Sequence, residues 1–87
     1  MYEIEIKKQV AKFINKRTPN ERIKIAQSFL LLRQNPYRSD LDIKKLTNTK
    51  NDFRLRIGKY RFLCTIFENR LLISMYKADT RGDIYKG

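Results

Sequence analysis

Residues 53–61 constrain the fold of this chain more than any other stretch. Apolar and cationic side chains alternate at its start, and this period of two is typical of a strand with one buried face. Gly58-Lys59 then fits a two-residue turn, because glycine supplies the positive φ that a type II′ hairpin needs at its first central position. Such a turn sets the register of the hairpin, and it places Arg56 opposite Arg61.

Three cationic side chains, Arg54, Arg56 and Arg61, share one face of the predicted hairpin. Like charges that stand opposite each other on neighbouring strands repel and destabilise a sheet. A polyanion bound across that face would relieve the repulsion. The pattern therefore predicts an anion-binding surface on this side of the hairpin.

Composition supports the same interpretation. The chain has 87 residues, which suits a single domain over 1–87, and it carries 20 Lys and Arg residues against 9 Asp and Glu residues. A net charge of +11 predicts a polyanionic partner, with nucleic acid ahead of a membrane surface. The alternative is that the charge only maintains solubility.

Residue types that the sequence lacks exclude several classes of function. The lone cysteine, Cys64, rules out an internal disulfide and favours an intracellular, cytoplasmic protein. There is no histidine, so histidine-based catalysis and a His-ligated metal are impossible. No apolar run approaches the about 20 residues of a membrane span, and the N-terminus lacks the apolar stretch of a signal peptide. We expect no metal, no cofactor and no membrane partner.

Upstream of the hairpin, the periodicity predicts a strand and two helices. Residues 2–6 alternate between apolar and acidic side chains, which indicates a first strand, and a short amphipathic helix follows from Lys7. A second helix begins at the capping box 18–21 and stops at Asn35-Pro36. Its end, residues 29–32, is apolar nearly all round, which indicates either burial on two sides or a docking surface for a partner. The expected buried face of this helix is Ile23, Ala26, Phe29 and Leu30.

Downstream, residues 37–52 are expected to be irregular, and two more strands are predicted at 60–67 and 70–77. The predicted order is β-α-α-β-β-β, an α+β fold in which a helical hairpin packs on one face of a mostly antiparallel sheet. The face expected to pack on the helices holds Phe53, Leu55, Ile57, Tyr60, Phe62, Cys64, Ile66, Leu71, Ile73 and Met75. The opposite, mixed face holds Arg54, Arg56, Arg61, Leu63, Thr65, Leu72, Ser74 and Tyr76.

A further arginine and tyrosine, Arg81 and Tyr85, follow the last predicted strand. If this tail folds back over the mixed face, both side chains join the three arginines of the hairpin in one cationic site. The alternative is a loose tail with a solvated arginine.

Residues 53–85 resemble the RelE/ParE toxin superfamily, and its RelE-like branch in particular. The upstream order, a short strand and a helical hairpin that ends near Asn35-Pro36, is similar too, so the resemblance covers nearly the whole chain. Members share a Tyr/Phe-Arg-x-Arg-x-Gly-x-Tyr-Arg hairpin, two hydrophobic strands and a late Arg followed by Tyr. The resemblance implies a toxin of a type II toxin–antitoxin pair, a ribosome-dependent endoribonuclease that cuts mRNA and is held inactive by an antitoxin. It implies catalytic roles for Arg61, Arg81 and Tyr85. It implies RNA phosphate binding by Arg54, Arg56, Lys59 and Tyr76.

The chain departs from the family pattern at two points. RelE itself has lysines where this chain has Arg54 and Arg56, and many relatives carry a histidine near the late arginine, where this chain has Asp79-Thr80. Guanidinium groups bind phosphate oxygens well, but their pKa above ~12 makes them poor acids and bases. Tyr85 is therefore the first candidate for proton transfer and Tyr76 the second. A site with so few acid or base groups would depend on the ribosome to set the RNA geometry.

Two other functions fit the same residues. A ParE-like toxin would inhibit DNA gyrase without cutting RNA, since such toxins keep a similar arginine-bearing hairpin. A catalytically silent basic module would bind only nucleic acid or an acidic protein. For the toxin interpretation, the expected partners are mRNA on the ribosome, with contacts to rRNA, and an acidic antitoxin whose amphipathic segments cover the basic face and residues 29–32.

Overall fold

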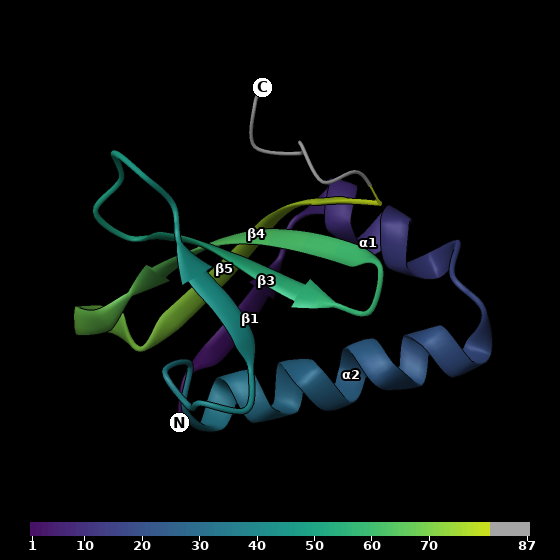
Figure 1. The fold of residues 1–87 in the computed structure, drawn as a ribbon, viewed down its shortest axis with the longest axis horizontal. Coiled ribbons are helices and arrows are strands. Elements are labelled where there is room, and N and C mark those ends of the chain that lie inside the picture. Colours follow the sequence, from purple (N-terminus) through teal and green to yellow (C-terminus); the bar gives the residue numbers. More distant parts are fainter. Residues whose placement is uncertain (81–87) are drawn as a thin grey trace.

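The computed structural model describes residues 1–80, which form two helices, a five-stranded sheet and one 3₁₀ turn. In chain order the elements are β1 (Glu3–Ile6), α1 (Lys8–Asn15), α2 (Pro19–Gln34), β2 (Asp42–Lys45), β3 (Asp52–Ile57), β4 (Tyr60–Phe67), η1 (Glu68–Arg70) and β5 (Leu72–Asp79). The strands lie in the order β1-β5-β4-β3-β2, with β1 parallel to β5 and the other neighbours antiparallel. The predicted α+β fold is confirmed (Figure 1).

One strand was absent from the predicted order. Residues 37–52 are not irregular throughout, because β2 pairs antiparallel with β3 at the edge of the sheet. Its sequence, Asp-Ile-Lys-Lys, carries a single apolar side chain, Ile43, which packs half-buried against the core. An edge strand buries little and so shows little of the alternation that marks a strand in a sequence.

The predicted capping box begins α2. The Glu21 N–H donates to the Thr18 hydroxyl at 3.3 Å, and the Thr18 N–H donates to the Glu21 carboxylate at 3.0 Å. Pro19 stands at the first position of the helix, where its missing N–H costs nothing. These contacts satisfy two of the orphan groups at the helix start, so the beginning of α2 follows directly from its sequence.

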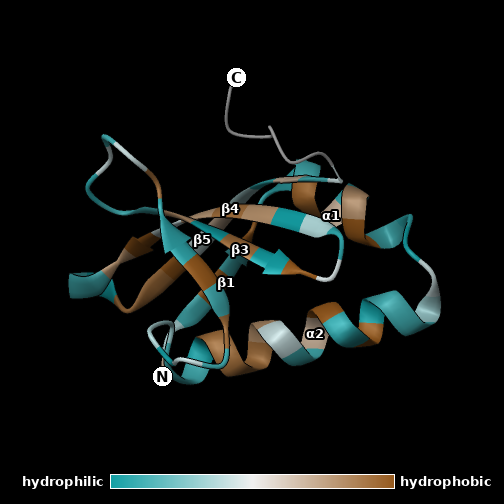
Figure 2. Cartoon of the chain, in the orientation of Figure 1, coloured by the Kyte–Doolittle hydropathy of each residue, from teal (hydrophilic) through white to brown (hydrophobic). Residues whose placement is uncertain are grey.

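The buried face of α2 differs from the predicted one. Ile25, Phe29 and Leu32 are buried, whereas Ile23 is 56% exposed and Leu30 is 49% exposed. Ala26 is exposed as well. Apolar residues occur on both sides of this helix, so periodicity alone does not decide which side packs on the sheet. Figure 2 shows brown apolar segments and teal polar segments mixed along α2.

The register of the β3–β4 hairpin is confirmed: Ile57 faces Tyr60, Arg56 faces Arg61 and Leu55 faces Phe62. The core lies between the sheet and the helices, and Phe62 at its centre makes edge-on ring contacts with Phe13 of α1 and Phe29 of α2. Leu71, expected in this core, is instead 49% exposed. It ends the 3₁₀ turn in the left-handed region, with φ of 49°, and so lies outside the alternation of β5.

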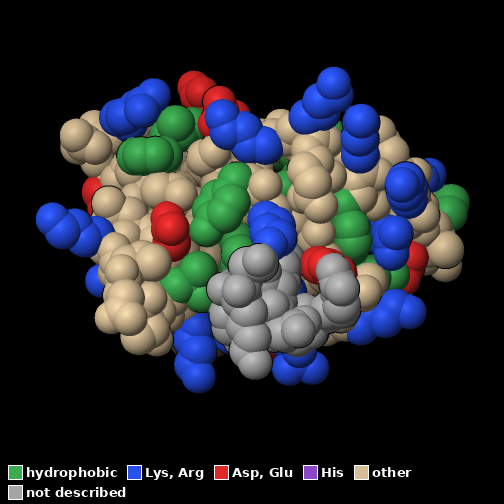
Figure 3. Space-filling view, turned by 90° about the horizontal axis from the view of Figure 1, so that it is seen from above, with side chains coloured by type: hydrophobic (Ala, Val, Ile, Leu, Met, Phe, Trp, Pro, Cys, Tyr) green, Lys and Arg blue, Asp and Glu red, His purple; other side chains and the backbone are tan. Residues whose placement is uncertain are grey.

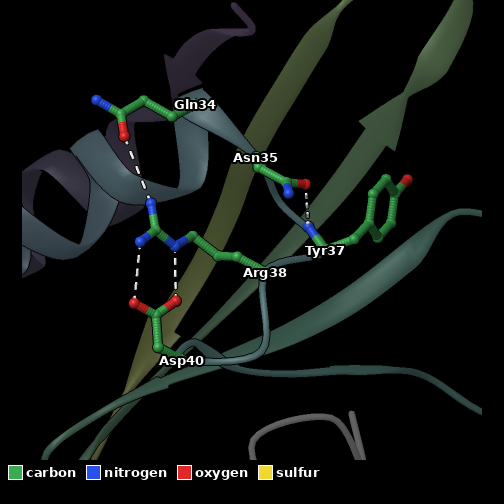
Figure 4. Close-up of polar contacts among 5 residues, drawn as sticks. All are labelled: Gln34, Asn35, Tyr37, Arg38 and Asp40. Atoms are coloured by element: carbon green, nitrogen blue, oxygen red, sulfur yellow. Dashed lines mark hydrogen bonds and ion pairs between the residues drawn. The ribbon is translucent and has the colours of Figure 1, made fainter.

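The connection from α2 to β2 is held by side chains of its own (Figure 4). The Asn35 side-chain oxygen accepts from the Tyr37 N–H at 3.0 Å, which shapes the turn after the helix. The Arg38 guanidinium donates to both oxygens of Asp40, at 2.6 and 3.0 Å, and to the Gln34 amide oxygen at 3.4 Å. This guanidinium lowers the pKa of the Asp40 carboxyl below its usual value. The contacts link the end of α2 to the start of the edge strand.

Candidate nucleic-acid interface

The side of the sheet away from the helices, here called the open face, carries a row of four charged residues across β2–β5. Strand register places Asp42 opposite Arg56, Arg56 opposite Arg61, and Arg61 opposite Asp79. We call these four residues the arginine row. Its two arginines are neighbours, as the sequence predicts, and an aspartate stands at each end. The aspartates offset part of the repulsion between the guanidinium groups.

The hairpin turn itself holds the two arginines of this row. The Arg56 Nε donates to the Gly58 carbonyl at 3.2 Å, and the Arg61 Nη1 donates to the Lys59 carbonyl at 3.4 Å. Gly58 has φ of +60°, as a type II′ turn requires at that position. Each guanidinium has five N–H donors, so both keep donors for an anion. The turn therefore orients two guanidinium groups, which are of a kind suited to bind phosphate.

A second row lies two residues further along the strands, and it contains Lys44, Arg54, Leu63 and Lys77. Arg54 is less available than the arginines of the hairpin tip, because its side chain is 14% exposed and donates to Asp42 at 3.3 Å. Leu63 is buried at the centre of this row. This middle row continues the positive charge of the arginine row toward the edge strand.

A third row, which we call the carboxylate row, carries acidic side chains where the middle row carries cationic ones. It contains Asp52, Thr65, Ser74 and Glu5. The Thr65 hydroxyl donates to Asp52 at 2.7 Å and the Ser74 hydroxyl donates to Glu5 at 2.8 Å. The pKa of Glu5 is lowered, first by the Ser74 hydrogen bond and then by Lys7, so this carboxyl stays ionised.

Tyr76 belongs to the acidic end of the open face. It is the extra residue of a β-bulge, since Leu63 pairs with Lys77 and Cys64 pairs with Met75. Its hydroxyl donates to Asp52 at 3.4 Å. Burial and this carboxylate raise the pKa of Tyr76 to about 12. A phenol with that pKa holds its proton near neutral pH and gives it up less readily than an ordinary tyrosine, so in the free protein Tyr76 is unsuited to accept a proton and is a weak donor of one.

Lys59 points to the other side of the hairpin. Its ammonium lies 5.7 Å from the centre of the Tyr60 ring, which packs on the helices, and it lines a groove together with Glu21 and Lys24 of α2. The structure therefore does not bring Lys59 onto the open face beside Arg61. The predicted phosphate contact of Lys59 would need a ligand that reaches around the tip of the hairpin.

Sequence reasoning missed the contact that anchors the hairpin tip to the helices. The Tyr60 hydroxyl donates to the carboxylate of Glu21, the same residue that completes the capping box of α2. The Arg17 guanidinium stacks over the rings of Phe13 and Tyr60, at 4.3 and 5.1 Å from their centres. Figure 1 shows the turn between β3 and β4 above the first half of α2. The tyrosine of the hairpin motif could have suggested such a contact, but its partner could not be identified from the sequence.

Two of the predicted catalytic residues, Arg81 and Tyr85, lie outside the described residues. Within residues 1–80, no three His, Cys, Asp or Glu side chains gather closely enough to hold a metal ion. No helix in this part of the chain is long and apolar enough to cross a membrane. Figure 3, which looks from the side away from α2, shows more blue Lys and Arg side chains than red Asp and Glu side chains.

Comparisons with known proteins show similarity to RelE toxins. A candidate toxin of the archaeon Methanocaldococcus jannaschii, RelE1, is 29% identical over 86 residues, which is 98% of this chain and 96% of the relative. No family model matches the sequence.

Solved structures of RelE proteins are similar to this chain in fold. The RelE–RelB complex of Pyrococcus horikoshii contains a chain that matches with a TM-score of 0.83 and 26% identity, over 94% of this chain and 97% of that chain. The isolated RelE toxin of Escherichia coli matches with a TM-score of 0.76 and 12% identity, over 98% of this chain and 92% of that one, and so supports the fold alone. Whole-length similarity of sequence and of fold confirms the resemblance drawn from residues 53–85.

Proposed function

Because this chain is RelE-like in both sequence and fold, we propose that it is the toxin of a toxin–antitoxin pair and that it cleaves mRNA on the ribosome. The observation that carries the proposal is the arginine row. Arg56 and Arg61 stand side by side on the open face, and carbonyls of the Gly58-Lys59 turn orient both guanidinium groups. Such preorganised donors suit a phosphate on which negative charge develops.

The chemistry available to the described residues covers one part of RNA cleavage. In this proposal the 2′-hydroxyl of the RNA gives up its proton and attacks the adjacent phosphate, and Arg56 and Arg61 stabilise the added charge on its oxygens. The P–O5′ bond then breaks, which leaves a 2′,3′-cyclic phosphate on one fragment, and the departing 5′-oxygen takes up a proton. Tyr76 holds its proton and lies at the acidic end of the face, so it is not the base that accepts the 2′ proton. That role stays with Tyr85 in the proposal, and Arg81 adds a third cation. The ribosome would supply the in-line geometry of the strand.

The partner that we propose is an acidic antitoxin. The chain has a net charge of +11, and α2 leaves Ile23 and Leu30 exposed on the side away from the sheet. The predicted docking surface at residues 29–32 is narrower than expected, because Phe29 and Leu32 are buried in the core. An acidic segment over the arginine row would compete directly with RNA.

The test is primer extension on mRNA of translating ribosomes, with and without the purified protein. The proposal predicts new 5′ ends within codons in the decoding site, and upstream products that carry a 2′,3′-cyclic phosphate. The control variant Lys12→Ala/Lys16→Ala changes two exposed lysines, one in α1 and one directly after it, and should retain cleavage. Growth arrest without any RNA cut, together with loss of DNA supercoiling, would instead support the ParE-like function.

A further inference from the structure

A cationic groove lies on the open face beside the loop that joins β2 to β3. Its volume is about 450 Å³. The described residues that line it are Lys44, Lys45, Leu46, Thr47, Thr49 and Arg54. We call it the β2–β3 groove. It lies beyond the hairpin motif that carries the family resemblance, apart from Arg54.

The groove concentrates positive charge. Three of its lining residues are cationic, and none of the described lining residues is acidic. Lys44 and Arg54 belong to the open face, whereas Lys45 stands opposite Phe53 on the alternate side of β2, at the edge of the sheet. Lys44 stands directly opposite Arg54, which makes a second like-charged pair across neighbouring strands. Arg54 is partly neutralised by Asp42, whereas the ion pairs of the described residues include neither Lys44 nor Lys45. An anion in the groove would offset this repulsion, as it would in the arginine row.

The loop that forms the wall of the groove is closed by its own hydrogen bonds. The Leu46 N–H donates to the Asp52 carbonyl at 2.8 Å, and the Thr49 hydroxyl donates to the Leu46 carbonyl at 2.8 Å. Asn48 takes the left-handed conformation at the tip, with φ of 64°. The groove therefore does not need a ligand to define its shape.

The lining identifies the kind of anion. Leu46 is the one apolar side chain among the described lining residues, so the groove lacks the aliphatic and aromatic anchors of a protein–protein contact. Interfaces with nucleic acid are more polar and more positively charged than those between proteins. The groove is also continuous with the arginine row through Arg54 and Lys44 of the middle row. Both features favour a phosphodiester backbone over an acidic peptide.

We propose that the β2–β3 groove binds a second phosphate of the same single-stranded RNA whose scissile phosphate lies at Arg56 and Arg61. β2 and β4 are two strand spacings apart, or about 10 Å, which a short stretch of extended backbone spans. The strand then runs across the sheet toward the β2 edge and avoids the carboxylate row. That the anion is RNA rests on the proposed function, while the binding of a phosphodiester chain in the groove is tested separately.

The experiment measures binding of a fluorescent 2′-O-methyl single-stranded RNA by anisotropy over a range of salt concentrations. This probe cannot be cleaved, so the readout does not depend on ribosomes or on catalysis. The affinity of the Lys44→Ala/Lys45→Ala variant should fall, and its salt slope should decrease by about 0.7 for each lost phosphate contact. Lys44→Gln/Lys45→Gln keeps more of the side-chain length and should show the same decrease.

The matched control is Lys12→Ala/Lys16→Ala, which removes the same charge from α1 and the residue that follows it. An equal change in slope for the control and the groove variants would overturn the inference, as would no measurable RNA binding by the wild type. Poly-glutamate serves as a second probe. If it binds with the same dependence on Lys44 and Lys45 while RNA does not bind, the occupant of the groove is an acidic protein and not RNA. A groove effect on RNA binding without wild-type cleavage on ribosomes would leave this inference standing and reject the proposed endonuclease.

Discussion

The two ends of the open face lie on the same strands and differ in charge. At the hairpin end, β3 and β4 contribute Arg56 and Arg61, whereas four residues along each strand they contribute Asp52 and Thr65. Four residues of strand span about 13 Å, so the two ends are close enough to act on one ligand. The open face of the sheet is therefore not uniformly basic. Lys7 pairs with Glu5 at 3.2 Å and Arg70 lines the same hollow, so the carboxylates are partly neutralised there. A polyanion is therefore held less strongly at this end than at the hairpin end.

The largest effect that this comparison predicts is at Arg61. Arg61→Ala should reduce ribosome-bound mRNA cleavage by about 10²–10³-fold, because it removes one preorganised donor to the charge that develops on the phosphate. Single-turnover primer extension gives the rate. The melting temperature should stay close to that of the wild type, since Arg61 is not part of the core. Cleavage within a factor of two of the wild type would show that the arginine row is not the site.

The second prediction contrasts two tyrosines. Tyr85→Phe should reduce cleavage by about 10²-fold or more if this phenol transfers a proton. Tyr76→Phe should reduce it by less than about tenfold, because Asp52 and burial keep the Tyr76 hydroxyl protonated at the acidic end. Both variants keep the ring, so ribosome binding serves as the control. The reverse order of effects would move the chemistry to the carboxylate row.

The third prediction concerns the turn that orients the arginines. Gly58→Ala should destabilise the protein by about 1–2 kcal/mol, since a side chain is strained at φ of +60°. No described atom lies within 4 Å of the added methyl group, so the cost comes from the backbone alone. Urea unfolding measures it. Gly58→Asn, which tolerates positive φ better, should recover part of the loss.

The fourth prediction concerns the anchor of the hairpin tip. Tyr60→Phe removes the hydrogen bond to Glu21 and keeps the ring contacts with Phe13 and Arg17. The melting temperature should fall by about 5 °C. Thr65→Val, at the other end of β4, removes a hydroxyl from the more exposed carboxylate row and should lower the melting temperature by less. A larger effect at Thr65 would mean that the polar network, and not the anchor, stabilises the sheet.

The smallest expected effect is a pH dependence at the acidic end. The pKa of Tyr76 is raised to about 12 in the folded protein from the ordinary tyrosine value of 10.0, so above pH 10 the unfolded chain loses this proton first. The contribution of Tyr76 to stability is therefore fully present below pH 10 and is lost as the pH rises toward 12. Urea midpoints measured at pH 9 and pH 11 should differ less for Tyr76→Phe than for the wild type. Equal differences would contradict the raised pKa of Tyr76, which burial and Asp52 cause together.

The hairpin could be predicted from interactions between residues close in the sequence. The features that the sequence did not predict depend on contacts between residues far apart in the chain. The register at Arg56 and Arg61 follows from a two-residue turn and a strict alternation, both of which act within a few residues. The buried side of α2 could not be predicted, since Ile25 and Ile23 are equally apolar and only the sheet distinguishes them. The anchor between Tyr60 and Glu21 joins residues 39 apart in the sequence. The division of the open face likewise depends on which strands become neighbours.

The pairing of β1 with β5 has a consequence for the time at which the fold can form. Glu3–Ile6 finds its hydrogen-bonding partner only at Leu72–Met75, nearly the whole length of the described chain away. During synthesis, the first strand to be made is the last to be paired, because β5 must emerge before the sheet can close. A sheet closed by so distant a contact forms slowly. A chain interrupted before Leu72 leaves β1 without a neighbour and β4 paired only with β3, so premature termination yields a protein in which β1 cannot join the sheet.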